Sequence, residues 1–253
     1  MSQILKGQIA IITGAGRGLG KAFALRFAEE GAKLFLPDIS LDRVEAVAKE
    51  IRAKKGEAVA TQTDVSDESA VKTMADKVME LYGRVDILLN NAGVYYGLTY
   101  RPWDSWTAKD WDRIFNVNVK GTWFCCKAIA PIMVKQKKGK IINIASGIMK
   151  SHASHLLLPY ALSKSAVNQL TLSLARALGP SGINVNSIAP GYTNTEASST
   201  LDKDVKESFE HAIAEQCIPR REEPEDLLGI AVFLASKESD FMTGQVVSVD
   251  GGV

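Results

Sequence analysis

The chain has 253 residues, of which 46% are hydrophobic and 23% charged, and its formal net charge is +1. This composition is typical of a soluble globular protein, and so small a net charge provides no field that would attract nucleic acid or an anionic membrane. Because the sequence also lacks a bilayer-spanning apolar run and a signal peptide, we expect a cytoplasmic protein with no membrane and no nucleic-acid partner.

Strand and helix patterns alternate along the chain. Short apolar runs rich in Ile, Val and Leu predict strands at 8–13, 33–37, 58–62, 87–90, 140–145, 183–189 and 245–249. Helical periodicity predicts helices at 18–30, 41–55, 66–82, 111–137 and 160–178, then a polar helical segment at 196–216 and a helix after Pro224. This alternation predicts an α/β fold in which helices cover both faces of a parallel sheet. With no linker or repeat to divide it, the chain is expected to form one domain, residues 1–253.

Capping residues support two of these helices. Ser66 is placed to cap one helix at its N-terminus, and Gly83 is placed to end the same helix. Thr107-Ala-Lys-Asp110 resembles a capping box and should open the long helix that follows.

A glycine-rich turn, Thr13-Gly-Ala-Gly-Arg-Gly-Leu-Gly20, connects the first strand to the first helix. A phosphate group there would meet a helix N-terminus, and the glycines would let a pyrophosphate approach the backbone amides. Glycine turns are often purely structural, and this spacing differs from the commoner G-x-G-x-x-G, but the strand–turn–helix context favours nucleotide binding. The expected cofactor contacts in the turn are Gly14, Arg17, Gly18, Leu19 and Gly20.

Asp38 ends the second strand, about 20 residues after the glycines, where an acidic residue commonly binds the adenosine ribose. Its carboxylate can accept hydrogen bonds from both ribose hydroxyls and would repel a 2′-phosphate. Arg17 favours NADP instead, because a guanidinium beside the glycine turn could pair with that phosphate. Since Ile39 offers no cation, we predict NAD as the cofactor and leave open whether Arg17 permits some use of NADP.

Tyr160 and Lys164 lie four residues apart in a predicted helix, and therefore on the same face of it. A phenol with a pKa of ~10 is a poor base at neutral pH, but a neighbouring ammonium stabilises the phenolate and lowers that pKa. The spacing alone is weak evidence, because two such residues are usually solvated on a helix surface.

Six motifs strengthen this interpretation because they occur in one order along the chain. They are Thr13–Gly20, Asn90-Asn-Ala-Gly93, Asn118, Ser146, the pair Tyr160 and Lys164, and Pro190-Gly191. Together they resemble the short-chain dehydrogenase/reductase superfamily, including its NAD-dependent secondary-alcohol dehydrogenases and its 3-oxoacyl-acyl-carrier-protein reductases. The resemblance implies one doubly wound Rossmann-type domain with a seven-stranded parallel sheet in the order 3-2-1-4-5-6-7. It also implies hydride transfer between a nicotinamide and an alcohol or carbonyl carbon.

Four catalytic roles follow from the resemblance. Ser146, which alone would be interpreted as a helix or turn cap, would donate a hydrogen bond to the substrate oxygen. Tyr160 would be the general base in oxidation and the general acid in reduction. Lys164 would hold the ribose hydroxyls and lower the tyrosine pKa. Asn118, three residues before Gly121, would hold a water that relays the proton to solvent.

The resemblance also implies cofactor contacts in the turns that follow the central strands. Asp64 and Val65 would contact the adenine, although alone they would be interpreted as a cap before a helix. Thr193 and Thr195 would meet the nicotinamide carboxamide. The remaining residues expected to shape the cofactor groove are Asn90, Asn91, Ala92, Gly93, Pro190 and Gly191.

Two loops are longer than the family pattern, and loops at the carboxyl edge of a parallel sheet commonly bind ligands. The connection after Gly93 is rich in aromatic residues, and the loop after Ser146 contains two histidines. We expect a substrate pocket walled by Tyr95 or Tyr96 and by His155, with Tyr192 opposite, next to Ser146 and Tyr160. The alternative is that the aromatic residues pack the loop onto a neighbouring helix or subunit.

No metal site is expected. His152 and His155 lie on a loop and have no third ligand. Cys125 and Cys126 are adjacent on a predicted helix, so they form neither a disulfide nor a chelate. Three cysteines cannot all pair, so we expect them to be reduced.

The family usually forms homotetramers, and one helix of this chain agrees with that. Apolar residues spread around the helix 111–137 instead of forming one stripe, which suggests a second buried face. They are Val117, Val119, Trp123, Phe124 and Ile129. The polar segment at about 194–217 would close over the substrate.

The leading hypothesis is an NAD-dependent dehydrogenase that interconverts a secondary alcohol and a ketone. The alternatives are an NADPH-dependent carbonyl reductase that resembles the 3-oxoacyl-acyl-carrier-protein reductases and a nucleotide-sensing protein without turnover. The partner is a small alcohol or ketone, whose identity the sequence leaves open.

Overall fold

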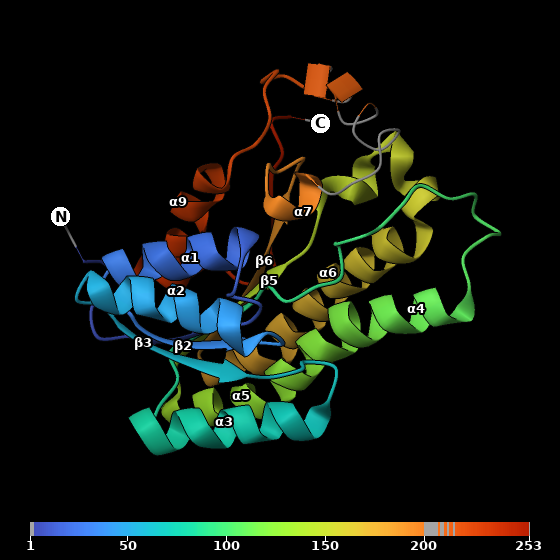
Figure 1. The fold of residues 1–253 in the computed structure, drawn as a ribbon. Helices are drawn as coiled ribbons and strands as arrows, with labels where there is room; N and C mark the ends of the chain where they lie inside the picture. Colours follow the sequence, from blue (N-terminus) through green and yellow to red (C-terminus); the bar gives the residue numbers. More distant parts are fainter. Residues whose placement is uncertain (1–2, 200–206, 208–209, 212, 215, 253) are drawn as a thin grey trace.

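A parallel sheet of seven strands forms the centre of the molecule, in the order β3-β2-β1-β4-β5-β6-β7 (Figure 1). The computed structural model describes residues 3–199, 207, 210, 211, 213, 214 and 216–252. The strands are β1 (Ile9–Ile12), β2 (Lys33–Asp38), β3 (Glu57–Gln62), β4 (Ile87–Asn90), β5 (Gly139–Ile144), β6 (Ile183–Pro190) and β7 (Val246–Val249). Both the parallel sheet and its strand order confirm the fold predicted from the sequence.

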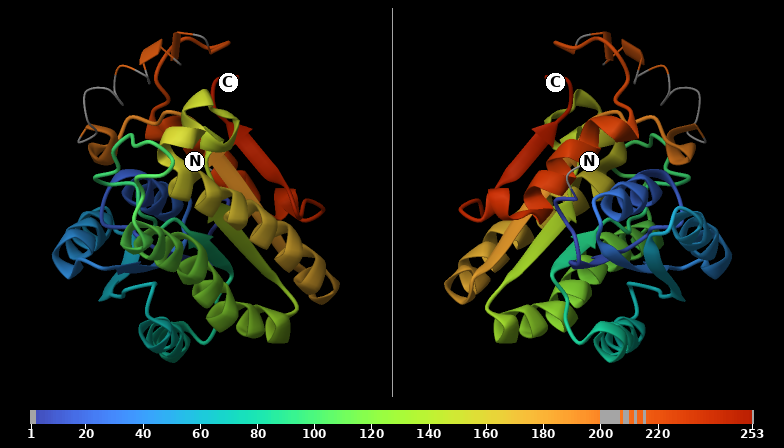
Figure 2. Two further views of the ribbon diagram at one scale, coloured as in Figure 1. Left: turned by 90° about the vertical axis from the view of Figure 1, so that its right-hand side faces the viewer. Right: turned by 90° about the vertical axis from the view of Figure 1, so that its left-hand side faces the viewer.

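Helices connect the strands and cover both faces of the sheet (Figures 1 and 2). The α-helices are α1 (Gly18–Glu29), α2 (Leu41–Ala53), α3 (Glu68–Tyr82), α4 (Ala108–Phe115), α5 (Thr122–Gln136), α6 (Leu158–Leu178), α7 (Glu196–Ser199) and α9 (Pro224–Ala235). A π-helix, η1 (Asn116–Gly121), joins α4 to α5, and two 3₁₀ segments, η2 (Gly147–Lys150) and η3 (His152–Leu157), precede α6.

Two apolar clusters hold the layers together. On one face, side chains of α1, α2 and α9 pack on the sheet, with Phe23 and Phe27 fully buried. On the other face, α3, α5 and α6 pack on it, with Met74 and Ile129 fully buried. Each such buried side chain stabilises the fold by roughly 1.5–3 kcal/mol, so the sheet is a rigid support for the loops at its edge.

The strand order reverses next to β1, which pairs with β2 on one side and β4 on the other. Connections from these strands therefore leave in opposite directions at their carboxyl ends. A crevice at such a reversal is the usual ligand site of an open parallel sheet.

The long helix expected at 111–137 is in fact three segments, because η1 separates α4 from α5. Its predicted start is confirmed, since Thr107 and Asp110 form a capping box. Gly83 ends α3 with a φ of 68°, as expected. The predicted N-cap of α3 is wrong by one residue: Asp67 accepts the hydrogen bonds of the first turn, while Ser66 donates to Asp64.

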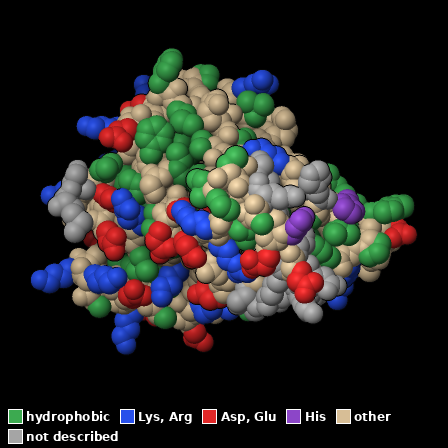
Figure 3. All heavy atoms as spheres, turned by 90° about the horizontal axis from the view of Figure 1, so that it is seen from above, with side chains coloured by type: hydrophobic (Ala, Val, Ile, Leu, Met, Phe, Trp, Pro, Cys, Tyr) green, Lys and Arg blue, Asp and Glu red, His purple; other side chains and the backbone are tan. Residues whose placement is uncertain are grey.

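Part of the predicted lid at 194–217, including residues 200–206, lies outside the described residues. Within the described part of the chain, no helix is long and apolar enough to cross a membrane. All three cysteines are free, and Cys125 and Cys126 are buried. Figure 3 shows acidic and basic side chains interspersed over the face seen from above.

The apolar residues used to predict a second buried face of the helix 111–137 differ in exposure: Val117 and Val119 are half-buried, and the other three lie at the extremes. Phe124 and Ile129 are buried in the chain's own core, so they say nothing about a partner. Trp123 is 41% exposed, and Leu162 on α6 is 44% exposed. The exposed apolar surface of this region therefore consists of fewer residues than the sequence pattern suggested.

Candidate active site

Two glycines of the turn between β1 and α1, Gly14 and Gly20, are packed too closely to carry a side chain. An ideal Cβ on Gly20 would lie 2.1 Å from the carbonyl oxygen of Gly14. One on Gly14, which has a φ of 66°, would lie 2.9 Å from Cα of Ala92. The turn therefore lies directly against the end of β4 and exposes bare backbone at the N-terminus of α1.

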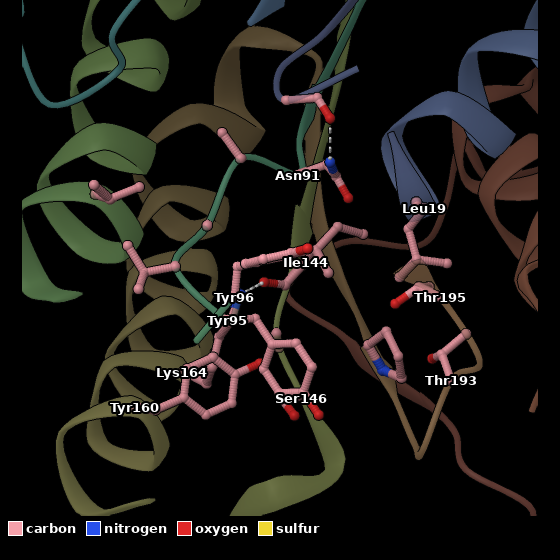
Figure 4. Close-up of a pocket in the computed structure, with 18 of the residues that line it drawn as sticks. Leu19, Asn91, Tyr95, Tyr96, Ile144, Ser146, Tyr160, Lys164, Thr193 and Thr195 are labelled. Atoms are coloured by element: carbon pink, nitrogen blue, oxygen red, sulfur yellow. Dashed lines mark hydrogen bonds between the residues drawn. The ribbon is translucent and has the colours of Figure 1, made fainter. Parts of the chain in front are cut away.

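Hydrogen bonds from the end of β4 hold this turn in place. The Thr13 hydroxyl accepts from the backbone N–H groups of Asn91 and Ala92, both at 3.0 Å. The Asn91 amide donates to the carbonyl oxygens of Thr13 and Gly14, both at 3.1 Å (Figure 4). Asn90 was also expected at the groove, but this is wrong. Its side chain is buried and donates to Asn143 Oδ1 at 2.9 Å, because successive strand residues point to opposite faces.

Asp38 lies at the end of β2, buried beside the turn. Its two carboxylate oxygens accept from the backbone N–H groups of Gly16 and Ser40, both at 2.9 Å. Arg43, in the first turn of α2, reaches Asp38 Oδ1 with Nη2 at 3.5 Å. Sequence reasoning missed this cation, although its position just after the start of α2 could have indicated it.

Arg17 stacks on an aromatic ring instead of facing Asp38. Its guanidinium carbon lies 4.0 Å from the centroid of the Tyr96 ring, a cation–π contact between the glycine turn and the loop after β4. Both side chains line the main cavity.

This cavity, of about 360 Å³, lies at the carboxyl ends of the central strands and receives side chains from both sides (Figure 4). Most of the residues predicted to bind cofactor or substrate line it. They are Gly14, Arg17, Gly18, Leu19, Asp38, Asp64, Val65, Asn91, Ala92, Gly93, Tyr95, Tyr96, Ser146, Tyr160, Lys164, Pro190, Gly191, Tyr192, Thr193 and Thr195. Gly20, Asn118 and His155 are not among the lining residues.

Tyr160, Lys164 and Ser146 converge at one end of the cavity. Tyr160 and Lys164 project from α6, as their spacing predicted, and both are buried. The Lys164 ammonium donates to the carbonyl oxygen of Ile144 at 2.8 Å and lies 5.8 Å from the Tyr160 ring centroid. Ser146 caps η2 by accepting from the Ile148 N–H at 3.2 Å, and its hydroxyl also faces Tyr160. Ser146 therefore combines the capping role and the position expected for a substrate contact.

Burial dominates the electrostatics of this group. It raises the pKa of Tyr160 to about 12, and the hydrogen bond with Ser146 only partly opposes this. Burial also lowers the pKa of Lys164 to about 8. The structure therefore does not show the lowering of the tyrosine pKa expected from Lys164, because burial removes solvation from both the phenolate and the ammonium.

Asn118 lies behind this group, in the π-helix η1. Its Oδ1 accepts from the Val94 N–H at 2.7 Å, and its Nδ2 donates to Ser163 Oγ at 2.9 Å. Its carbonyl oxygen accepts from the Thr122 hydroxyl at 2.8 Å. The Asn118 side chain thus fixes the loop after β4 against α6. A water bound here would have to use the hydrogen-bonding positions of the amide that Val94 and Ser163 leave free.

The opposite side of the cavity is formed by the segment after β6. Thr193 bonds to the buried carboxyl group of Glu222, which sequence reasoning missed because the two residues are far apart in the chain. Glu196, at the start of α7, accepts from the Gly18 N–H through Oε2 at 3.1 Å. A carboxylate oxygen thus already occupies the N-terminus of α1.

Aromatic side chains form the wall near Tyr160. The rings of Tyr95 and Tyr160 have centroids 5.4 Å apart, and burial raises the pKa of Tyr95. The Tyr192 hydroxyl bonds to Ser151 Oγ at 2.9 Å. Trp106 is instead buried within the loop cluster, as the packing alternative predicted, whereas Trp103 is exposed.

These residues fit a nicotinamide dinucleotide. The glycine turn leaves room for a pyrophosphate, and the Gly18 N–H at the N-terminus of α1 donates to an anionic oxygen of Glu196. Among the described residues, the Lys164 ammonium has one hydrogen-bond acceptor, Ile144 O, so its other N–H groups remain available for ribose hydroxyls.

Comparisons with known proteins agree with this geometry. A family model described as Enoyl-(Acyl carrier protein) reductase matches residues 14–253. A 3-oxoacyl-(acyl-carrier-protein) reductase of Thermotoga maritima is 35% identical over 250 residues, with 98% of each chain covered. Galactitol 2-dehydrogenase of Agrobacterium fabrum is 37% identical over 257 residues, again with 98% of each chain covered.

Among solved structures, a 7α-hydroxysteroid dehydrogenase complexed with NADH and 7-oxo glycochenodeoxycholic acid is similar, with a TM-score of 0.90 and 34% identity. The alignment covers 99% of this chain and 96% of that one. The chain therefore belongs to the short-chain dehydrogenase/reductase superfamily, whose oxidoreductases act on alcohols and ketones and typically use NAD or NADP.

Proposed function

We propose that this protein is an NAD-dependent dehydrogenase that interconverts a secondary alcohol and a ketone, with Tyr160 as the general acid and base. The observation that carries the proposal is the convergence of Tyr160, Ser146 and Lys164 in one buried cavity beside the glycine turn. A bound nicotinamide would supply the hydride acceptor for oxidation of the alcohol carbon.

Each side chain has a separate task in this reaction. Ser146 donates a hydrogen bond to the substrate oxygen and stabilises negative charge on it. Tyr160 removes the hydroxyl proton during oxidation and returns it during reduction. Because burial disfavours the phenolate, Tyr160 needs positive charge nearby in the loaded enzyme, and the Lys164 ammonium supplies part of it.

The proton then leaves through the interior of the protein. Lys164 holds the ribose hydroxyls and passes the proton on, and a water at Asn118 relays it to solvent. The support for this path is that an ideal Cβ on Gly93 would lie 3.3 Å from Asn118 Oδ1 and 3.6 Å from Lys164 Nζ, so the three residues are neighbours.

Asp38 supports NAD as the preferred cofactor. Its carboxylate is held by two backbone N–H groups, and a 2′-phosphate placed there would face a fixed negative charge. The second candidate, an NADPH-dependent carbonyl reductase, is favoured by Arg43, which lines the cavity next to Asp38 and could pair with such a phosphate. The Thermotoga relative shows that reductases of acyl-carrier-protein substrates are similar in sequence.

We further propose that the chain acts as one domain and assembles as a homotetramer, with the segment 194–217 as a lid. The exposed side chains of Trp123 on α5 and Leu162 on α6 support a contact with a second copy. The lid is supported by the contact of Glu196 with the glycine turn, at the start of that segment. Light scattering at micromolar concentration measures the assembly, and a monomer there contradicts it.

The decisive experiment is an assay of purified protein with NAD⁺ and NADP⁺ against a panel of neutral secondary alcohols, followed by the absorbance of reduced nicotinamide. The aromatic wall favours ring-bearing alcohols such as 1-phenylethanol in that panel. We expect turnover with kcat/KM at least about tenfold higher for NAD⁺, a difference of ~1.4 kcal/mol. Equal efficiency with both cofactors would contradict the NAD assignment, and binding of NADH without turnover of any substrate would favour the sensing alternative.

A further inference from the structure

A buried carboxyl group lies directly behind the segment that follows β6. Glu222 pairs with Thr193 in an isolated parallel β-bridge, and its carbonyl oxygen accepts from the Asn194 N–H at 2.7 Å. The backbone before α9 therefore holds Gly191–Thr195 in place, and that segment forms one side of the cavity.

The Glu222 side chain points at the same segment. It is 6% exposed, and its Oε2 accepts from the Thr193 hydroxyl. Its other oxygen, Oε1, has no hydrogen-bond partner among the described residues. Burying a carboxylate with half of its acceptors unused is costly, so a purely structural role does not explain an acid at this position.

The charged groups that face Glu222 make its ionisation harder. Asp226, in the first turn of α9, and Asp250, after β7, both repel a negative charge on it. Two cations of this region bond to these aspartates: Arg220, which also attracts Glu222 through space, bonds to both oxygens of Asp226, at 2.6 and 2.7 Å, and Lys150 lies 3.4 Å from Asp250.

Burial, and to a smaller extent these two aspartates, raises the pKa of Glu222 to about 7, while the hydrogen bond from Thr193 opposes the rise. The carboxyl group therefore changes its charge near neutral pH. The same group is one hydrogen bond away from the cavity, because Thr193 lines it.

We propose that Glu222 is a positioning residue for Gly191–Thr195 and that its negative charge favours binding of oxidised over reduced nicotinamide. This inference rests on the proposed function, which places the nicotinamide against Thr193 and Thr195. The oxidised ring is cationic and the reduced ring is neutral, so a carboxylate behind Thr193 attracts only the first. Binding of NAD⁺ then releases the proton of a neutral Glu222 to solvent, and binding of NADH does not.

The carboxyl group also sets the hydrogen-bonding direction of Thr193. When Glu222 is ionised, the Thr193 hydroxyl must donate to it and can only accept from the cofactor side. When Glu222 is protonated, it can donate to Thr193, and the hydroxyl is then free to donate toward the cavity. The charge of Glu222 thus reaches the cofactor both through space and through one hydroxyl.

The first test measures binding without turnover, in a Tyr160→Phe background that removes the titration of the phenol. We expect the ratio of the Kd of NADH to the Kd of NAD⁺ to rise about threefold to tenfold between pH 6 and pH 8. Glu222→Gln should hold that ratio at its pH 6 value. Glu225→Gln, which removes an exposed carboxylate from the same segment, should leave the rise intact.

The outcomes separate this inference from the proposed function. If NADH does not bind at all, the proposed function fails. If both cofactors bind and the ratio changes equally with pH in Glu222→Gln, only the role of Glu222 is wrong. Thr193→Ser, which keeps the hydroxyl, should preserve the pH dependence, whereas Thr193→Val should reduce it.

The second test uses the protein without cofactor. The folded pKa of Glu222 is raised above its ordinary value, so its contribution to stability is greatest at low pH and is lost as the pH rises from about 4.5 to about 7. Glu222→Gln should therefore raise the melting temperature at pH 8 by about 2–4 °C and have no effect near pH 4.5. An equal effect of the substitution at both pH values would overturn the proposal, because the carboxyl group would then not be titrating in this range.

Discussion

The two sides of the cavity are built in different ways. The side with the glycine turn is held by close backbone packing and by hydrogen bonds that Asn91 donates to Thr13 and Gly14 and that the Gly16 N–H donates to Asp38. The side with the aromatic wall is held by side chains of separate loops, such as Tyr95 against Tyr160 and Tyr192 against Ser151. The first side therefore admits almost no substitution, whereas the second can be rebuilt by changing side chains without moving the sheet.

This difference separates cofactor from substrate. The dinucleotides that members of the superfamily bind share the pyrophosphate and the nicotinamide, so most of the cofactor site can be fixed in the backbone. A substrate that varies from one relative to another needs walls that can change, and aromatic side chains on loops provide them. The following substitutions test this division, from the largest expected effect to the smallest.

Tyr160→Phe acts at the point where the two sides meet, and it should have the largest effect. It removes the proton acceptor, so kcat should fall by about 10²–10⁴ while NADH still binds and quenches protein fluorescence. Tyr82→Phe, at the end of α3, is the matched control and should retain full activity. Retention of a tenth or more of the rate by Tyr160→Phe would show that the phenol is not the base.

Lys164→Ala should lower the rate of alcohol oxidation by roughly 10² and move the surviving activity to higher pH. The reason is that the Tyr160 pKa, raised to about 12 by burial, depends on nearby positive charge to come down. Oxidation by the unmodified enzyme should rise with pH because it needs the phenolate. A pH profile of kcat for both proteins measures the shift. Lys164→Arg should impair alcohol oxidation in part, because the planar guanidinium of arginine does not replace a compact ammonium.

Asp38→Ala tests the backbone-held side alone. Loss of the charge-assisted hydrogen bonds to the ribose should lower kcat/KM for NAD⁺ by about tenfold to a hundredfold. Use of NADP⁺ should improve because Arg43 is then released from Asp38, and Arg43→Ala added to this variant should cancel the gain. Asp42→Ala, an exposed neighbour, is the control, and an unchanged cofactor ratio in Asp38→Ala would contradict the assignment.

Tyr192→Phe tests the side held by side chains. It removes one hydrogen bond to Ser151, so KM for the alcohol should rise by less than about tenfold, with little change in kcat and none in the Kd of NADH. Ser151→Ala should have a similar effect, and the double variant should be no worse than either single one. A change in the Kd of NADH as large as the change in KM would contradict the proposed division of the cavity into a cofactor side and a substrate side.

Glu196→Gln should have the smallest effect, and it should strengthen cofactor binding instead of weakening it. Its carboxylate binds the Gly18 N–H, where a pyrophosphate would lie, so removing the charge should tighten NADH binding about twofold to fivefold. The gain should shrink at high ionic strength. Glu29→Gln, an exposed acid at the other end of α1, should not change the Kd, and weaker binding in Glu196→Gln would show that the residue helps to hold the cofactor.

The sequence predicts the backbone-held side well because its chemistry is local. Gly14, Gly18 and Asp38 belong to one strand–turn–helix–strand unit, in which spacing along the chain determines position in space. Tyr160 and Lys164 were predictable for the same reason, since helical spacing alone puts them on one face.

Contacts between distant segments were not predictable in this way. Glu222 meets Thr193 across a long stretch of chain, and nothing in either local pattern indicates the pairing. His155 was expected at the pocket wall, but it lies in η3 and does not line the cavity, because the orientation of a loop depends on packing that no motif encodes. Arg43 was not predicted although it is near Asp38 in the chain, because only the folded structure shows that its side chain turns back from the first turn of α2 toward the end of β2.

The π-helix at Asn116–Gly121 also limits how this chain can evolve. A residue advances an α-helix by about 100°, and a π-turn contains one residue more than the α-turn that it replaces. Deleting one residue here would replace the π-turn by an α-turn that covers the same rotation with one residue fewer, so buried Phe124 and exposed Trp123 would keep their faces of α5. The change would instead fall on the turn itself, where Asn118 bonds to the Val94 N–H and to Ser163 Oγ, so this stretch can lose a residue only if the loop after β4 and α6 are held together in another way.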